Sequence, residues 1–395
     1  MNDDPIVIVS AARTPIGAFM GDLKALAAPE LGAIAIRAAV ERAGIRPEEV
    51  QEVIMGNVLP AGQGQAPARQ AAMGAGLPPA VGCMTINKVC GSGMKAAMLA
   101  HDMLALGAIE VMVAGGMESM SNAPYLLPRA RAGLRLGHGE VKDHMFLDGL
   151  EDAYDRGRLM GTYAEDCADQ YRFSREAQDR YAITSLTRAQ DAIKGGGFER
   201  EIVPVNIAGG KTEAVVRIDE QPLKANLDKI PQLKPAFRTD GTVTAANSSS
   251  ISDGAAALVL MKRSEADRRG IAPLARIIAY STHSQEPQWF TTAPVGAIRK
   301  LFERAGWDAK TTDLFEINEA FAVVAMAAMH DLGLPHDKVN VHGGACALGH
   351  PLGASGARIM VTLLAALEKY RLKRGIAALC IGGGEATAIA LERVN

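Results

Sequence analysis

The segment that decides the fold is IRAAVERAG, residues 36–44, because the chain repeats it as IRKLFERAG at residues 298–306. In both copies apolar residues recur at helical spacing, and a glycine follows the last of them. Each copy is therefore predicted to be an amphipathic helix that ends at a glycine cap. The resemblance of two segments so far apart indicates an internal repeat.

The strands that follow the two helices also correspond. Residues 53–57 and 314–318 are apolar segments that each lead to an asparagine, and residues 111–116 and 378–383 are apolar segments that run into glycines. Three correspondences in the same order indicate two copies of one α/β unit. Strands that alternate with helices predict mostly parallel sheets covered by helices.

A long insertion separates the two copies. The predicted division is 1–120 for the N-terminal core half, 121–250 for a loop domain and the return to that half, 251–269 for its end and a linker, and 270–395 for the C-terminal core half. Within the insertion, residues 174–195 predict a long amphipathic helix with Ser174 as its N-cap. Residues 121–160 are predicted to be irregular, and 206–240 to form loops and short strands. Insertions of this size usually carry substrate contacts or an oligomer interface.

Composition and charge exclude several classes of protein. The 395 residues are 48% hydrophobic and carry a net charge of −2, so nucleic acid and anionic membranes are not expected partners. Five cysteines without CxxC or Cys/His metal spacing indicate a reducing compartment and no metal site. No apolar run is long enough to span a membrane, and the acidic N-terminus does not resemble a signal peptide. We expect a soluble, cytoplasmic protein.

The segment INKVCGSGMKAAM, residues 86–98, places Cys90 where a helix is expected to begin. Unpaired backbone N–H groups and the positive end of the helix dipole lie at such a position, and both favour a thiolate. Gly91 and Gly93 allow a sharp turn and a close approach of a ligand or another part of the chain. A buried structural cysteine is the alternative, but the glycines and the helix start favour a nucleophile.

Three other segments place reactive groups among glycines or strand ends. They are NEAF (318–321), GHPLGASG (349–356) and CIGGG (380–384). If the two halves pack face to face, these segments converge on Cys90. His350 could then accept the thiol proton, Cys380 could move another proton, and Asn318 could orient a water molecule or donate to an oxyanion. Each segment alone is more simply interpreted as a turn or a strand end, but the set favours catalysis.

These segments resemble the motifs of the thiolase family: VCGSG resembles its nucleophile motif, and NEAF, GHP and CxGGG resemble three further motifs, in the family's order. The resemblance covers essentially the whole chain. It implies an α/β fold of layered αβαβα type, with two pseudo-symmetric halves and an inserted loop domain. It also implies that Cys90 carries an acyl group, that His350 activates it, and that Cys380 moves the proton at the substrate α-carbon. Asn318, through a water molecule, and His350 would form one oxyanion hole, and the N–H groups of Cys90 and Gly382 the other.

The resemblance further implies a substrate path. Residues 242–254 resemble the loop that holds the pantetheine arm of coenzyme A, with Ala245 and Ser249 as contacts. Met160 and Phe321 match residues that line the acyl pocket. From the residues alone, the loop would be a serine-rich turn and both apolar side chains would belong to the core.

Some residues depart from the family pattern. His342 stands where asparagine is frequent, Cys346 replaces an aliphatic residue, and Glu385 stands where glutamine is commoner. We interpret His342 and Glu385 as silent, and Cys346 as a packing residue. The GKT sequence at Gly209–Thr212 is not a phosphate-binding loop, because Val205 occupies the position of the loop's first glycine.

The predicted function is that of an acetyl-CoA C-acetyltransferase, which joins two acetyl-CoA molecules into acetoacetyl-CoA and CoA by ping-pong Claisen condensation, reversibly. Acyl-CoA and CoA are the expected partners, and no metal or redox cofactor is expected. A broad-chain 3-ketoacyl-CoA thiolase is one alternative, and a non-catalytic acyl-CoA- or lipid-binding protein of the same fold is another. Decarboxylating ketoacyl synthases pair one cysteine with two histidines, so Cys380 disfavours them. The excursion at 121–145 is expected to mediate assembly of a homotetramer, as a loop does in this family.

Overall fold

The centre of the protein is one mixed sheet of ten strands, seen in a computed structural model that describes residues 4–207 and 214–394. Gly209–Thr212 lies outside the described residues. In spatial order the sheet contains β12 (Leu314–Ile317), β13 (Arg374–Ile381), β14 (Glu385–Arg393), β11 (Ala275–Ser284), β1 (Ile6–Arg13), β10 (Ser252–Lys262), β5 (Val111–Ser119), β3 (Glu52–Gly56) and β4 (Gly82–Ile86), with β2 (Gly17–Ala18) beside β10.

The order of the strands shows the predicted duplication. In the N-terminal half, β1 pairs with β10, β10 with β5, and β5 with β3; in the C-terminal half, β11 pairs with β14, β14 with β13, and β13 with β12. The first two pairings of each series are antiparallel and the third is parallel. The halves join through β1 and β11, which share only the pairs Val7–Arg276 and Ile8–Ala275. The prediction of two pseudo-symmetric halves is confirmed.

The prediction of mostly parallel sheets is wrong. Among the described strands of the sheet, only β3–β4, β3–β5 and β12–β13 pair in parallel, while the long strands at the centre pair antiparallel. The reason lies in the connection at Gly382–Gly384, which is too short to form a crossover and can join β13 to β14 only as antiparallel neighbours. Strand β10 likewise returns from the insertion against the direction of β5.

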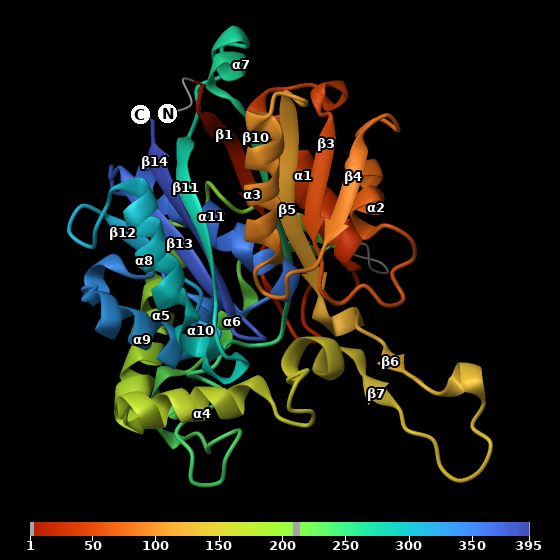
Figure 1. The fold of residues 1–395 in the computed structure, drawn as a ribbon, viewed down its shortest axis with the longest axis vertical. Coiled ribbons are helices and arrows are strands. Elements are labelled where there is room, and N and C mark those ends of the chain that lie inside the picture. Colours follow the sequence, from red (N-terminus) through yellow and green to blue (C-terminus); the bar gives the residue numbers. More distant parts are fainter. Residues whose placement is uncertain (1–3, 208–213, 395) are drawn as a thin grey trace.

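Helices pack on the outer side of each half of the sheet and between the two halves, in the layered α/β arrangement that was predicted (Figure 1). Helices α1 (Ala28–Ala43) and α2 (Pro67–Gly74) pack on the N-terminal strands, and α8 (Ala293–Ala305) and α9 (Ala322–Leu332) pack on the C-terminal strands. Between them, α3 (Ser92–Ala105) and α11 (Leu352–Lys369) share one core with strands of both halves. This central pair of helices is the part of the fold that positions the site.

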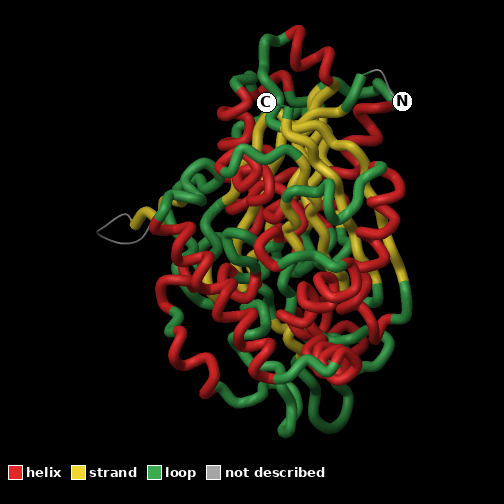
Figure 2. Tube along the Cα trace, turned by 90° about the vertical axis from the view of Figure 1, so that its left-hand side faces the viewer, coloured by secondary structure: helices red, strands yellow, loops and turns green. Residues whose placement is uncertain are grey.

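Helices and loops gather below the strands (Figure 2), and the insertion contributes α4 (Met160–Tyr171), α5 (Arg175–Lys194) and α6 (Glu220–Lys224) to this region (Figure 1). It also contains the hairpin β8 (Val205–Ile207) and β9 (Ala214–Val216). Ser174 caps α5 as predicted, because its hydroxyl accepts a hydrogen bond of 3.2 Å from the N–H of Ala177. The domain boundaries at 120, 250 and 269 stay a prediction.

The excursion near the start of the insertion forms an arm that projects from the body (Figure 1). Its stem is the short pair β6 (Tyr125–Leu126) and β7 (Lys142–Asp143). The remaining short helices are α7 (Arg263–Arg268), before β11, and α10 (Ala345–Leu348), before α11. Among the described residues, no helix combines the length and apolar character needed to cross a membrane.

Candidate active site

Two helix N-termini meet at the centre of the molecule. Cys90 lies two residues before the start of α3, and His350 lies two residues before the start of α11. The first turns of these helices are in direct contact: a Cβ added to Gly93 would lie 3.0 Å from the carbonyl oxygen of Gly353. Glycine is needed there for close packing. The helix pair therefore brings Cys90 and His350, far apart in the chain, to one end of the same core layer.

The end of β13 is the third part of the site. A Cβ on Gly91 would lie 2.4 Å from Cδ1 of Ile381, so the Cys90 turn packs directly on this strand end. The backbone N–H of Gly382 lowers the pKa of the Cys90 thiol, so this group lies near the sulfur. Cys380 is 1% exposed, and a charge on Cys90 raises the pKa of the Cys380 thiol further than burial alone does. The structure thus brings together Cys90, Cys380 and the Gly382 N–H.

Cys90 is protonated at rest. Burial raises the pKa of its thiol to about 12, although the N–H groups of Gly382 and Cys90 favour the thiolate. The prediction that a helix start favours the thiolate holds for these backbone groups, but desolvation outweighs them. A base must therefore act when the nucleophile is used.

His350 is neutral and its tautomer is fixed by hydrogen bonds. Burial, with the nearby charge of Arg358, lowers its pKa to about 3. The hydroxyl of Ser355 donates to the carbonyl oxygen of Pro351 at 2.9 Å and lies 2.5 Å from Nδ1 of His350. Because that hydroxyl has already used its proton, Nδ1 must be the donor to Ser355. The other ring nitrogen, Nε2, is buried, has no hydrogen-bond partner among residues 4–207 and 214–394, and carries the free lone pair.

Asn318 lies beside His350 at the end of β12 and is fully buried. Its Oδ1 accepts a hydrogen bond of 3.4 Å from Arg358, which leaves its NH₂ group directed toward the imidazole, 3.5 Å from Nδ1. Two donors cannot bond to each other, so this last contact is not a hydrogen bond. The NH₂ group of Asn318 remains available to a water molecule or an oxygen of a substrate.

A buried carboxylate supports the start of α11 from the N-terminal half. Glu118, on β5, accepts hydrogen bonds from the N–H groups of Gly353 at 2.8 Å, Val58 at 2.9 Å and Leu59 at 3.1 Å. Burial nevertheless raises the pKa of Glu118 to about 7. This side chain ties the helix that follows His350 to the strand that lies behind Cys90.

The predicted pantetheine loop contacts two of the other motifs. The N–H of Ser249 donates to the carbonyl oxygen of Ala320 at 2.9 Å, and the N–H of His350 donates to that of Ser250 at 3.1 Å. On its other side the loop borders a pocket of about 240 Å³, which is lined by Ala245 together with Leu233, Lys229 and Cys346. Ala245 therefore lies at this pocket, and Ser249 lies at the segment that precedes Phe321.

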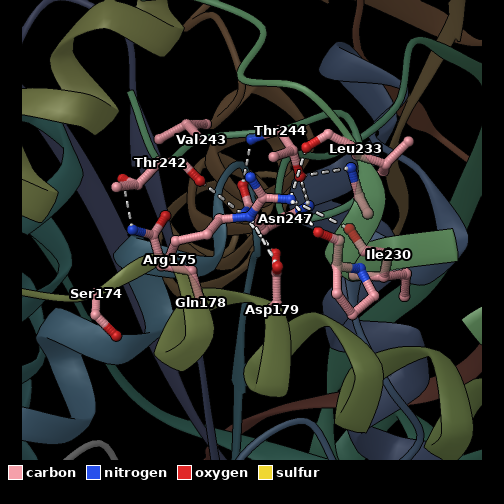
Figure 3. A network of polar contacts seen from close by, with 12 residues as sticks. Ser174, Arg175, Gln178, Asp179, Ile230, Leu233, Thr242, Val243, Thr244 and Asn247 are labelled. Atoms are coloured by element: carbon pink, nitrogen blue, oxygen red, sulfur yellow. Dashed lines mark hydrogen bonds and ion pairs between the residues drawn. The ribbon is translucent and has the colours of Figure 1, made fainter. Parts of the chain in front are cut away.

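A polar network fixes the shape of this loop (Figure 3). Asn247 donates from Nδ2 to Asp179 on α5 at 3.2 Å, and its Oδ1 accepts from the N–H of Thr244 at 2.7 Å. Arg175 binds Asp179 at 2.7 Å and also reaches the carbonyl oxygen of Leu233 at 2.8 Å. The inserted domain thus holds both the loop and the segment on the opposite side of the pocket.

Met160 and Phe321 lie where an acyl group would be enclosed. The sulfur of Met160, at the start of α4, lies 3.4 Å from a Cβ placed on Gly382. Phe321 is buried and packs edge-to-face against Phe237 and Phe290, with ring centroids 6.0 and 6.4 Å apart. Met160 therefore borders the site directly, whereas the contacts of Phe321 also fit a core residue.

Sequence reasoning missed several residues that support the site. Glu118, Arg358 and Ser355 touch the predicted site residues or the backbone beside them, yet none was assigned a role. The sequence held a clue to two of them. Glu118 lies near the end of an otherwise apolar strand, and Arg358 interrupts an apolar helical stretch. His342, in contrast, packs edge-to-face on Phe198 with ring centroids 5.7 Å apart, away from these groups.

Comparisons with known proteins agree with this geometry. Residues 6–264 match the N-terminal domain of thiolase and residues 271–393 match its C-terminal domain. An acetyl-CoA acetyltransferase of Cupriavidus necator is 51% identical, with 98% of this chain and 99% of the relative covered. A cytosolic acetyl-CoA acetyltransferase of Mus musculus is 50% identical, with 99% and 98% covered. The crystal structure of the Bacillus anthracis acetyl-CoA acetyltransferase superposes with a TM-score of 0.96 at 44% identity, covering 99% of both chains. The chain belongs to the thiolase family.

Proposed function

We propose that this protein is an acetyl-CoA C-acetyltransferase that works through an acyl-enzyme on Cys90. The observation that carries the proposal is the meeting of the Cys90 turn, Cys380 and the Gly382 N–H at one strand end, next to the helix pair that also positions His350. Relatives that match over nearly the whole chain bear the name acetyl-CoA acetyltransferase, which supports the choice of substrate.

The first half-reaction transfers an acetyl group to Cys90. Nε2 of His350 accepts the thiol proton while the sulfur attacks the carbonyl carbon of acetyl-CoA, and the bond from that carbon to the CoA sulfur breaks. His350 then returns the proton to the leaving CoA thiolate. With pKa values of about 12 for Cys90 and about 3 for His350, proton transfer before attack is unfavourable. Transfer and attack are therefore expected to be concerted, with the N–H groups of Cys90 and Gly382 holding the oxyanion.

The second half-reaction forms the new carbon–carbon bond. Nε2 of His350 accepts the proton of the Cys380 thiol, and the resulting thiolate removes a proton from the methyl group of a second acetyl-CoA. The enolate oxygen is then held by the protonated Nε2 of His350 and by a water molecule on Asn318. The enolate carbon attacks the acetyl carbon on Cys90, the bond to the Cys90 sulfur breaks, and His350 gives its proton to that sulfur, while Cys380 keeps the proton from the methyl group. Each preorganised oxyanion donor is worth about 10²–10³ in rate.

The pantetheine arm would enter along the loop at 242–250, with Ala245 and Ser249 as contacts and Met160 and Phe321 around the acyl group. The hydrogen bonds from this loop to the segments at 318–321 and 349–350 support that path. We propose coenzyme A as substrate and product, with no metal or redox cofactor. Within the part of the chain that the structure describes, no cluster of three His, Cys, Asp or Glu side chains has the arrangement of a metal site.

Labelling with radioactive acetyl-CoA tests the acyl-enzyme. We expect stable labelling of the wild-type protein, no label in Cys90→Ser, and normal labelling in Cys346→Ser, which removes a thiol outside the proposed mechanism. We expect Cys380→Ser to be labelled normally but to condense slowly. No label in the wild-type protein would favour a non-catalytic acyl-CoA-binding protein. Comparison of acetoacetyl-CoA with C8–C16 substrates separates a short-chain enzyme from a broad-chain thiolase.

We also propose a cytoplasmic homotetramer assembled through the arm at 121–145. The arm exposes apolar side chains, among them Tyr125, Val141 and Leu136, the last of which is 99% exposed. Such side chains on a projecting arm fit a second copy of the chain. Sedimentation of the wild-type protein and of Leu136→Asp tests this: we expect a tetramer that the substitution weakens, and a wild-type monomer would contradict it. Cell fractionation tests the compartment; two relatives are named as cytosolic.

A further inference from the structure

An ion pair joins the turn that carries Cys90 to the strand that follows the glycine turn. Nζ of Lys88 lies 2.6 Å from Oε2 of Glu385, and the two residues are 297 positions apart in the chain. The other carboxylate oxygen of Glu385 accepts a hydrogen bond of 3.0 Å from the hydroxyl of Ser284 on β11. The side chains of Lys88 and Glu385 are only 21% and 33% exposed. This pair therefore links the two halves directly at the proposed site.

The turn on the Lys88 side is strained. Val89, the residue before Cys90, has a φ of +46°, which is rare for a β-branched residue and marks a conformation that the surroundings must enforce. Part of that enforcement is local, since the N–H of Gly91 donates to the carbonyl oxygen of Lys88 at 3.0 Å. The N–H of Lys88 itself donates to the hydroxyl of Ser92 at 2.8 Å. These bonds fix the turn internally but do not fix its distance from the other half.

The turn on the Glu385 side presents the oxyanion donor. Gly383 and Gly384 have φ values of +92° and +88°, and the carbonyl oxygen of Gly384 accepts a bond of 2.8 Å from the N–H of Gln285. Gly382, at the start of this turn, faces the Cys90 turn: a Cβ placed on it would lie 3.9 Å from Cγ1 of Val89, and its N–H lowers the pKa of the Cys90 thiol. The distance between that N–H and the sulfur depends on how closely the two turns are held together.

The negative charge of Glu385 is stabilised by its neighbours. Burial opposes ionisation of Glu385, but Lys88 and the Ser284 hydroxyl hold its pKa below the usual value. Exposed ion pairs contribute little to global stability, so loss of this one is expected to have a small effect on unfolding. Its effect on a reaction that depends on the placement of one sulfur atom can be much larger, because a misplacement of about 1 Å can cost about 10²-fold in rate.

We propose that Lys88 and Glu385 are positioning residues that hold the strained Cys90 turn against the glycine turn, so that the sulfur stays at the Gly382 N–H. The inference rests on the proposed acyl transfer to Cys90. It assigns a role to Glu385, which the sequence alone presents as silent. A lysine near a site for acyl-CoA could instead bind the phosphates of coenzyme A. The proposal gives Lys88 a different role, in positioning.

A charge-reversal cycle tests the proposal. The variants are Lys88→Met, Glu385→Gln and the double variant Lys88→Glu/Glu385→Lys. The matched control is Glu49→Gln, which breaks the Glu49–Arg269 ion pair, whose side chains are 24% and 13% exposed, remote from Cys90. The readouts are the single-turnover rate of Cys90 acetylation, the acetyl-CoA concentration at half-saturation, and the melting temperature.

We expect each single substitution at the pair to slow acetylation about tenfold, with a change in half-saturation of less than about twofold. The double variant should recover to within about threefold of the wild-type rate, and Glu49→Gln should acetylate normally. Wild-type rates in both single variants would overturn the proposal, as would failure of the double variant to recover. A raised half-saturation concentration in Lys88→Met alone, at unchanged rate, would overturn it in favour of phosphate binding.

The rate at which iodoacetamide alkylates Cys90 separates this inference from the proposed function, because alkylation requires no acyl transfer. The same pattern of change in the single variants and recovery in the double variant is expected. Absence of acetylation in the wild-type protein would contradict the proposed function. An alkylation rate that is unaffected by breaking the Lys88–Glu385 pair would contradict the positioning role, whatever the outcome of acetylation.

Discussion

The N-terminal ends of α3 and α11 are equivalent parts of the two halves, yet they support different chemistry. A reactive group lies two residues before the start of each helix, Cys90 in one half and His350 in the other. Burial acts on both in opposite directions: it raises the pKa of the thiol to about 12 and lowers that of the imidazole to about 3. The same scaffold therefore delivers an acid and a base that are both uncharged at neutral pH.

The two ends also differ in what holds them. The Cys90 turn contains a strained residue, Val89, and is tied to the other half at the partly exposed Lys88–Glu385 pair. The His350 turn is held by buried hydrogen bonds, from its ring to Ser355 and from Gly353 to Glu118. The comparison indicates that the nucleophile depends on contacts near the surface, whereas the base depends on the core.

The largest expected effect comes from removing the base. We expect His350→Ala to lower the condensation rate about 10³-fold or more, because both a proton acceptor and an oxyanion donor are lost. Release of CoA measured with a thiol reagent follows the reaction. His342→Asn is the matched control, since it changes another buried histidine of the same half whose contacts are ring packing. If the His350→Ala enzyme keeps a rate within tenfold of the wild-type rate, His350 is not the catalytic base, and only the Cys90 helix end takes part in catalysis.

The second expected effect is on the pH dependence of folding stability. Glu118 and His350 should contribute to it with opposite signs. Glu118 keeps its proton up to a pH of about 7 when folded but loses it near 4.5 when unfolded. The folded state therefore binds more protons between these values, and stability falls as pH rises through them, by about 3 kcal/mol in total. His350 has a folded pKa below its usual 6.5, so its contribution falls as pH decreases from 6.5 toward 3.

Urea unfolding between pH 4.5 and 7.5 measures these contributions. Relative to the wild-type protein, Glu118→Gln should gain stability as pH rises from 4.5 to 7, and His350→Ala should gain it as pH falls below 6.5. The difference between variant and wild type is the quantity compared, so the constant cost of each substitution cancels. Parallel curves for the wild-type protein and both variants would contradict the burial argument for these two groups.

The sequence predicted much of this arrangement because the chain is duplicated. The helices at 28–43 and 293–305 and the strands that follow them are visible as repeats, and the four motifs lie at repeat-related strand or helix ends. Spacing along the chain does not reveal burial, however. The protonated state of Cys90 and the contact between Lys88 and Glu385 depend on groups contributed by the opposite half. The antiparallel centre of the sheet escaped prediction because strand direction follows from the connections, not from the strand sequences.

The smallest expected effect tests whether the buried hydrogen bond to Ser355 assists catalysis by orienting the imidazole of His350. Ser355→Ala removes the hydroxyl that accepts from Nδ1 and donates to the carbonyl oxygen of Pro351, so both neutral tautomers become available and the rate should fall about tenfold without a change in half-saturation. Ser10→Ala is the matched control, because it also removes a buried hydroxyl, which donates to the carbonyl oxygen of Ala39 at 2.6 Å, far from the site.

Both serine variants should lose about 1 kcal/mol of unfolding free energy, the ordinary contribution of one such hydrogen bond. Only Ser355→Ala should also lose activity, because only its hydroxyl selects the nitrogen of His350 that faces the reaction. If the two variants lose stability equally and both keep the wild-type rate, the hydrogen bond to His350 is structural. The two helix ends would then differ less than their hydrogen bonds indicate.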